Sequence, residues 1–147
     1  MAIEWFLAAA IILLLDQTSK ALVVRLHQGK TPFQGAFRPR IRVTYNACLG
    51  LVQFLDKRVL IVLWSISLLA TILLTNHVTC LKGFTAQIGL GVSIGGATGN
   101  LIDILRRGLV IDFIDLRIWP VFNIADAALV IGLAITFLSL GTMQIGA

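Results

Sequence analysis

Four long apolar segments limit what this chain can fold into. Each approaches the roughly 20 apolar residues that a helix needs to cross the hydrocarbon core of a bilayer. The segments cover about residues 5–26, 59–76, 84–105 and 121–143. With 58% of its residues hydrophobic and 13% charged, the chain exceeds the apolar content of a soluble domain. The sequence therefore predicts an all-α membrane protein, a single integral membrane domain over residues 1–147 that forms a bundle of four transmembrane helices.

The longest polar connection, residues 27–58, contains a strand pattern. Its apolar residues alternate with basic or polar ones, namely Phe37, Ile41, Val43 and Tyr45 with Arg38, Arg40, Arg42 and Thr44. Such a period of two indicates a strand with one basic face. Pro39 belongs to an edge strand or lies just before the strand begins. With a second short strand near residues 49–54, we expect a small sheet within residues 33–55, with its arginines at the lipid headgroups.

The first apolar segment contains a polar run, residues 16–20, that reads DQTSK. Asp16 and Lys20 are four residues apart, so they share one helical face, with the acid in the favourable N-terminal position. Two interpretations stay open. The pair lets the helix end in the headgroup region, or it supports polar groups inside the bundle.

The third segment carries a stripe of small residues. Gly91, Gly95 and Gly99 recur every four residues, which allows a second helix to approach closely. Close packing there would hold Asn100 and Asp103 rigidly against a neighbouring helix.

The fourth segment is predicted to begin directly after Pro120, because proline suits the first turn of a helix. Asn123 and Asp126 are then three residues apart and share one face. Trp119 is the type of residue that lies at a membrane interface.

The junction between the third and fourth segments concentrates the acidic residues. Four of the seven in the chain lie there, namely Asp103, Asp112, Asp115 and Asp126. Burying unpaired carboxylates beside apolar spans costs several kcal/mol, so such residues usually have a function. For any single aspartate that function can be a helix cap or a salt bridge. Asp103 with Arg106 or Arg107 fits this simpler role, and Asp115 pairs with Arg117 or faces water.

Asp112 and Asp126 have a further possibility. The end of one span and the start of the next lie at the same membrane depth, so these two carboxyl groups can face each other. Two adjacent carboxyl groups share one proton and titrate as a pair. Such a pair can activate a water for attack on an amide and protonate the departing nitrogen. We expect no metal and no cofactor.

The sequence lacks the motifs of other catalytic mechanisms. No histidine accompanies a serine or cysteine in a triad pattern, and neither a HExxH motif nor a glycine-rich phosphate loop is present. The net charge of +5 is explained by basic loops beside anionic lipid headgroups, so we expect membrane lipids as partners and no nucleic acid.

Five short motifs, in order along the chain, resemble those of lipoprotein signal peptidase (signal peptidase II), the bacterial inner-membrane aspartic peptidase. They are DQTSK at residues 16–20, an asparagine motif at Asn46, GGATGNLID at 95–103, VIDFID at 110–115 and FNIAD at 122–126. The resemblance covers nearly the whole chain. It implies a multi-pass protein of the bacterial inner membrane, with four helices, both termini cytoplasmic, and a small extracytoplasmic sheet between the first two helices.

The resemblance also implies an activity. Members of this family remove the signal peptide from prolipoproteins by cleaving on the N-terminal side of the diacylglyceryl-modified cysteine. Their catalytic aspartates match Asp112 and Asp126. Their conserved polar residues around the site match Asp16, Lys20, Asn46, Asn100, Asp103 and Asn123.

The sequence departs from the family pattern in three respects. Ile104 stands where the family usually has an arginine, and Cys48 and Leu51 replace a glycine and a phenylalanine of the asparagine motif. Of the twelve Lys and Arg residues, only Lys82 falls on the side that the family places inside. The positive-inside rule alone would therefore predict the opposite orientation of the chain in the membrane.

These departures motivate a rival hypothesis, a non-catalytic paralogue that acts as a subunit of a membrane complex. A third hypothesis is a small proton-coupled transporter, which would need polar residues spread through the membrane depth.

Overall fold

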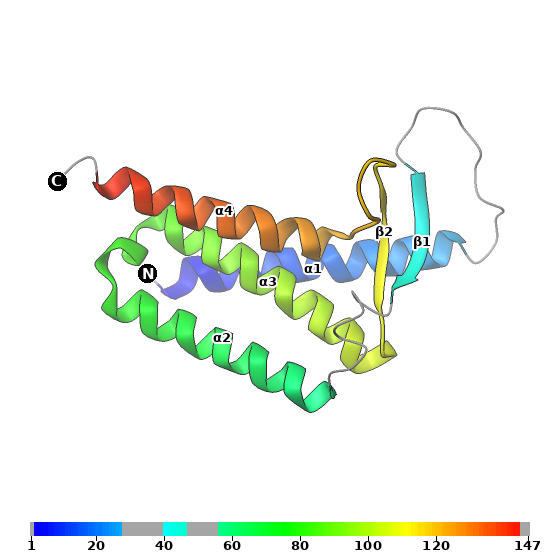
Figure 1. The fold of residues 1–147 in the computed structure, drawn as a ribbon, viewed down its shortest axis with the longest axis horizontal. Coiled ribbons are helices and arrows are strands. Elements are labelled where there is room, and N and C mark those ends of the chain that lie inside the picture. The colour runs from blue at the N-terminus through cyan, green and yellow to red at the C-terminus, as the bar shows by residue number, and fades with distance from the viewer. Residues whose placement is uncertain (1, 28–39, 47–55, 145–147) are drawn as a thin grey trace.

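In the described residues, four α-helices lie side by side, and two strands cross one end of them (Figure 1). The computed structural model describes residues 2–27, 40–46 and 56–144. The elements in order are α1 (Ala2–His27), β1 (Arg40–Asn46), α2 (Lys57–His77), the short 3-10 helix η2 (Thr79–Lys82), α3 (Phe84–Arg107), β2 (Val110–Asp115) and α4 (Ile124–Gln144).

The helices have the length and composition of membrane-spanning elements. Within the described residues, three helices are apolar and long enough to cross a membrane: α1, α2 and α3. A shorter apolar helical segment, Ile124–Leu140, belongs to α4. Large apolar side chains face outward, such as Leu14 at 65% exposed, Leu63 at 50% and Phe137 at 76%. An outer surface of this kind suits lipid rather than water, and the predicted mostly helical membrane fold is confirmed.

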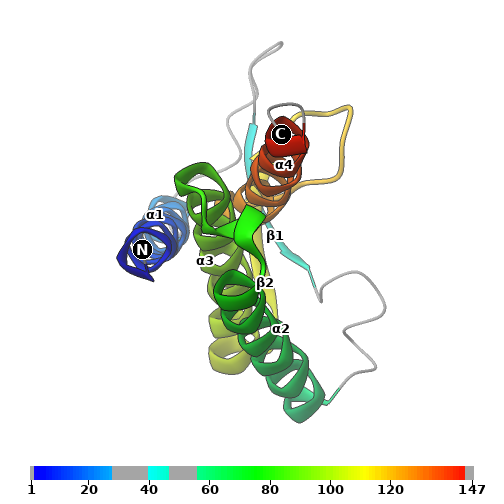
Figure 2. The ribbon, with the colours of Figure 1, turned by 90° about the vertical axis from the view of Figure 1, so that its left-hand side faces the viewer.

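Helix α3 is the centre of the bundle. It packs against α1, α4 and α2, and Figure 2 shows it between α1 and α2. Helix α2 is peripheral, because among the described elements it contacts only α3 and η2. The interior polar groups of the molecule are therefore held chiefly by α1, α3 and α4.

Glycines of α3 explain why α1 and α4 come so near. A Cβ atom added at Gly95 would lie 2.6 Å from the carbonyl oxygen of Ala9, and one added at Gly99 would lie 2.6 Å from Oδ2 of Asp16. Gly91 faces α1 in the same manner, and Gly89 and Gly96 face α4. The predicted small-residue stripe is confirmed, and its partner is α1.

We expect Gly95→Ala to destabilise the protein by about 1–3 kcal/mol, the usual cost of overpacking a tight contact. The new methyl group meets backbone of α1, which cannot move aside as a side chain can. Thermal unfolding in detergent micelles measures the effect. Gly108→Asn is the matched control, because Gly108 has a φ of 76° and open space around its Cβ position, a conformation that asparagine tolerates. Equal unfolding temperatures for the two variants would contradict the stripe as a packing surface.

The sheet differs from the prediction in its composition. Strand β1 begins at Arg40, directly after Pro39, as the pattern indicated. Its partner is β2, which it pairs antiparallel, with Thr44 opposite Asp112 and a register shift between Ile41 and Thr44. The sheet thus joins the α1–α2 connection to the α3–α4 connection rather than lying within residues 33–55. The second strand expected at residues 49–54 lies outside the described residues.

The start of α4 is also later than predicted. The backbone of Phe122 pairs with Ile114, donating its N–H to the Ile114 carbonyl (3.1 Å) and accepting the Ile114 N–H (2.8 Å). Phe122 is therefore extended, and α4 begins at Ile124 rather than at Val121. Pro120 lies in the loop before the helix, so its assignment to the first helical turn was wrong.

Candidate active site

Two residues cap the first turn of α4, because the side chain of each accepts the backbone N–H of the other. Asn123 precedes the helix, and its Oδ1 accepts the backbone N–H of Asp126 at 2.9 Å. In return, Oδ2 of Asp126 accepts the backbone N–H of Asn123 at 3.2 Å. This reciprocal arrangement is a capping box, built here from asparagine and aspartate. It fixes the carboxyl group of Asp126 at the helix N-terminus, where orphan N–H groups favour an acid.

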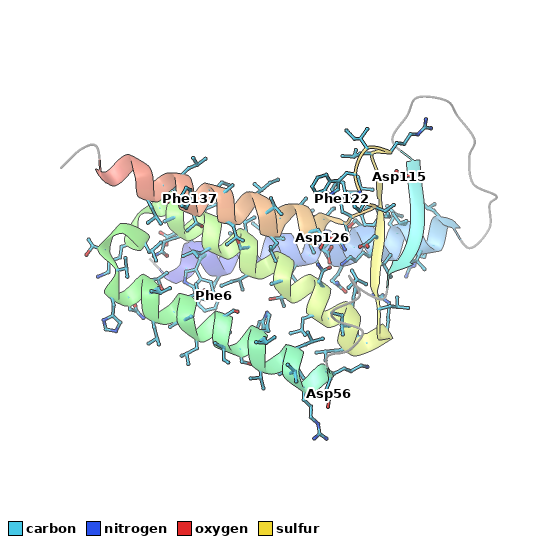
Figure 3. All side chains as sticks on the ribbon, viewed as in Figure 1. Phe6, Asp56, Asp115, Phe122, Asp126 and Phe137 are labelled. Atoms are coloured by element: carbon cyan, nitrogen blue, oxygen red, sulfur yellow. The ribbon has the colours of Figure 1, made fainter. Side chains whose placement is uncertain are left out.

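Helix α3 holds the other oxygen of Asp126. Nδ2 of Asn100 donates to Oδ1 of Asp126 at 2.7 Å. Both carboxyl oxygens are thus engaged, one by α3 and one by the start of α4, while the residue stays half-buried. Figure 3 shows Asp126 at the end of the bundle that carries the strands, the end at which Phe122 and Asp115 also lie.

Asp112 reaches the same place from the sheet. It lies on β2 with 6% of its surface exposed, and its Oδ1 accepts Nδ2 of the fully buried Asn123 at 2.7 Å. The same Nδ2 lies 3.1 Å from Oδ1 of Asn100. Asn123 therefore contacts both acids, Asp112 through its side chain and Asp126 through the capping box. The antiparallel pairing with β1 fixes the backbone of Asp112, which lies opposite Thr44.

Next to these two acids, α1 and α3 hold a buried network of charges. Nζ of Lys20 is 2.7 Å from Oδ2 of Asp16 and 2.7 Å from Oδ2 of Asp103, and all three side chains are fully buried. Arg107 pairs with the other oxygen of Asp103. Two cations thus balance two anions, as a buried ion cluster requires. The prediction that Asp16 and Lys20 pair is confirmed, and so is the pairing of Asp103 with Arg107.

The charge network is connected to the acid pair by two contacts, and a third contact joins α1 to α3. Nζ of Lys20 donates to Oδ1 of Asn100 at 3.1 Å, which turns Nδ2 of Asn100 toward Asp126. Oδ1 of Asp16 accepts the backbone N–H of Ala125 at 3.0 Å, so α1 caps the start of α4. Nε2 of Gln17 donates to the Gly99 carbonyl at 3.2 Å. The first turn of α4 is therefore held from α1 and α3 together.

The structure brings most of the predicted site residues together. Connected by direct contacts are Asp16, Lys20, Asn100, Asp103, Asp112, Asn123 and Asp126. Asn46 lies on β1 with its Cα opposite Val110, and its side chain lies outside the described part. Asp115 accepts the backbone N–H of Arg117 at 2.8 Å. Sequence reasoning missed Gln17, although it lies within the DQTSK motif, and the backbone N–H of Ala125, which no sequence pattern reveals.

We expect Arg107→Ala to destabilise the protein by about 1–2 kcal/mol, since it removes a charged hydrogen bond to buried Asp103. Lys20 continues to pair with Asp103 and limits the loss. Thermal unfolding in detergent is the measurement, with Arg107→Lys expected to recover part of the stability. Arg106→Ala, which removes the same charge from the exposed neighbouring position, is the control. If both alanine variants unfold alike, the Arg107 pair does not support the network.

The comparison with known proteins gives a consistent result. The family described as signal peptidase (SPase) II matches residues 8–142. A lipoprotein signal peptidase of Pelotomaculum thermopropionicum is 40% identical over 132 residues, which cover 86% of this chain and 84% of that protein. A lipoprotein signal peptidase of Moorella thermoacetica is 36% identical over 137 residues, covering 89% and 88%. A solved bacterial membrane enzyme superposes with a TM-score of 0.77 at 25% identity, covering 92% of this chain and 91% of that one.

Proposed function

Because this chain belongs to the signal peptidase II family, we propose that it is an aspartic endopeptidase that removes signal peptides from prolipoproteins. It cleaves on the N-terminal side of the diacylglyceryl-modified cysteine. Its substrates are membrane-anchored, and it works in the bacterial inner membrane without a cofactor. Asp112 and Asp126 carry out the reaction.

The observation that supports this proposal most strongly is the double contact made by Asn123. Its side-chain amide donates to Asp112 and its backbone N–H donates to Asp126. Two carboxyl groups, one from strand β2 and one from the first turn of α4, therefore contact one buried residue. A structural role for a single aspartate would not require a second carboxyl group at the same place, because like charges destabilise each other when buried.

The chemistry follows from a water held between the two carboxyl groups. One carboxylate takes a proton from the water. At the same time, the oxygen of that water bonds to the carbonyl carbon of the scissile amide. The other, which holds the shared proton, gives a hydrogen bond to the carbonyl oxygen and stabilises the tetrahedral intermediate. The C–N bond then breaks, and the departing nitrogen receives the proton that the water gave up. The products are a free carboxyl terminus and a free amine.

The neighbouring residues orient this pair rather than react. Asn100 and Asn123 each donate to a carboxyl oxygen, which restricts both carboxyl groups to one geometry. Asp16, Lys20 and Asp103 hold Asn100 and the first turn of α4. A role in substrate binding is proposed for Asn46 from the family resemblance; its backbone lies on β1, which pairs with β2.

The proposed membrane arrangement has four spans. The 21 residues of α4 extend about 32 Å at 1.5 Å per residue, which matches the roughly 30 Å hydrocarbon core. With both termini cytoplasmic, the sheet and the two aspartates lie near the extracytoplasmic face. A site at this depth lets the acyl chains of the substrate remain in lipid while the peptide bond reaches the acids.

Purified protein incubated with a diacylglyceryl-modified prolipoprotein tests the proposal. We expect a cleaved product whose N-terminal residue, identified by mass spectrometry, is the lipid-modified cysteine. The same precursor without the diacylglyceryl group is the control substrate and should remain uncleaved. A well-folded sample that cleaves neither precursor would favour the non-catalytic paralogue instead.

A further inference from the structure

The loop between β2 and α4, residues 116–121, has an apolar and exposed tip. Its base is closed by the pairing of Ile114 with Phe122, so the loop projects as a finger. Ile118 is 91% exposed and Trp119 is 69% exposed, and Leu116 is 46% exposed. An apolar tip of this size, left in water, costs free energy without any compensating contact in the protein.

The loop projects sideways from the bundle. Strand β2 runs across the helix ends rather than along them, so its end lies at the side of the molecule, next to the start of α4 (Figure 1). In the view along the helices, the segment after β2 lies beside α4 and outside the group of helices (Figure 2). A finger in this position lies level with the ends of the membrane-spanning helices, where a lipid leaflet meets water.

The finger is held in its shape by a local contact. Oδ1 of Asp115 accepts the backbone N–H of Arg117 at 2.8 Å. Arg117 itself has a φ of 64°, a left-handed conformation that costs about 1–2 kcal/mol for a residue other than glycine. The residues that follow this strained position, Ile118 and Trp119, are both largely exposed.

We infer that residues 116–119 insert into the headgroup region of the leaflet next to the acid pair and act as an interfacial anchor. Tryptophan prefers this depth because its ring is apolar and its N–H is polar. The charge of Arg117 adds attraction to anionic phosphates. The leaflet is continuous with the outward side of α4, whose Val130 is 64% exposed and Phe137 is 76% exposed.

The anchor has a consequence for the depth of the site. Trp119 lies four residues before Asn123, which caps α4 and contacts both acids. Fixing Trp119 at the headgroups therefore fixes the height of Asp112 and Asp126 against the leaflet surface. This inference does not depend on the proposed reaction, because it concerns where the protein contacts lipid.

Fluorescence of Trp119 alone tests the inference. The full-length variant Trp5→Phe/Trp64→Phe, placed in vesicles of phosphatidylglycerol and brominated phosphatidylcholine, leaves Trp119 as the single emitter. We expect greater loss of emission when the bromines lie near the glycerol than when they lie near the acyl chain ends. Acrylamide in the aqueous phase should quench weakly. Strong quenching by acrylamide with little effect of either bromolipid would place the finger in water and overturn the inference.

A second variant checks that the apolar tip causes the insertion. Adding Ile118→Asp to the single-tryptophan protein should shift the emission of Trp119 to longer wavelength and increase its quenching by acrylamide. Val78→Asp is the matched control, because Val78 is an exposed aliphatic residue between α2 and η2, away from the finger. An Ile118→Asp variant that behaves like the Val78→Asp control would contradict insertion, and circular dichroism verifies that both are folded.

Discussion

Asp126→Asn should abolish cleavage of a diacylglyceryl-modified prolipoprotein while the protein stays folded. Asparagine has nearly the same shape, and its Oδ1 can still accept from Asn100 or from the backbone N–H of Asn123. It cannot take a proton from water, so we expect the rate to fall roughly a thousandfold or more, within the range that acid–base groups contribute. A single-turnover cleavage assay in detergent measures the rate, and thermal unfolding shows whether the fold survives.

Asp115→Asn is the matched control for that experiment. Asp115 lies on the same strand as Asp112, but its side chain accepts the backbone N–H of its neighbour Arg117, and asparagine preserves that contact. We expect nearly full activity from this variant and a loss equal to that of Asp126→Asn from Asp112→Asn. Substantial cleavage by either Asp126→Asn or Asp112→Asn would remove the assignment of the acid pair.

Lys20→Met should have the largest effect on stability. It leaves Asp16 without its buried counter-ion and Asp103 with Arg107 alone. Removing one partner from a buried ion cluster costs about 3–5 kcal/mol, because the remaining charge is both desolvated and unpaired. Methionine has a similar volume, so packing around the site changes little. Thermal unfolding in detergent should show a clear fall in the transition temperature.

Two further variants show whether the loss of stability comes from an unpaired buried charge or from the loss of any basic residue on α1. Arg25→Met removes a positive charge from an exposed position on the same helix and should leave the unfolding temperature nearly unchanged. Lys20→Met/Asp16→Asn restores electrical balance around Asp103 and Arg107, so it should be more stable than Lys20→Met alone. If the double variant is less stable than the single one, unpaired charge is not the reason for the loss.

The sequence was sufficient to predict the helices and the contacts that depend on helical spacing. Apolar runs of membrane length located α1, α2 and α3. A separation of four residues predicted the pairing of Asp16 with Lys20, and the glycine stripe predicted a close helix partner for α3. These features are local, or they repeat at the helical period, and one chain segment is enough to reveal them.

The contacts that hold the two acids could not be predicted in the same manner. The residues of β2 alternate little in hydrophobicity, since Val110, Ile111 and Phe113 are all buried. Nothing in them indicated a strand that pairs with β1, some 70 residues earlier. The spacing of Asn123 and Asp126 predicted a shared helical face. Their true relation is a capping box, because Phe122 remains extended and delays the helix to Ile124.

The distribution of partners along the chain also sets the order in which the protein can assemble as it is synthesised. Asp16 accepts from Ala125, a residue 109 positions later. At about 5–20 residues per second, the ribosome needs roughly 5–20 s to complete that interval. During this delay α1 is already made, but the α4 residue that donates to its Asp16 is not. Lys20 lies on the next helical turn and is made at almost the same time, so it neutralises Asp16 before the partner on α4 is available.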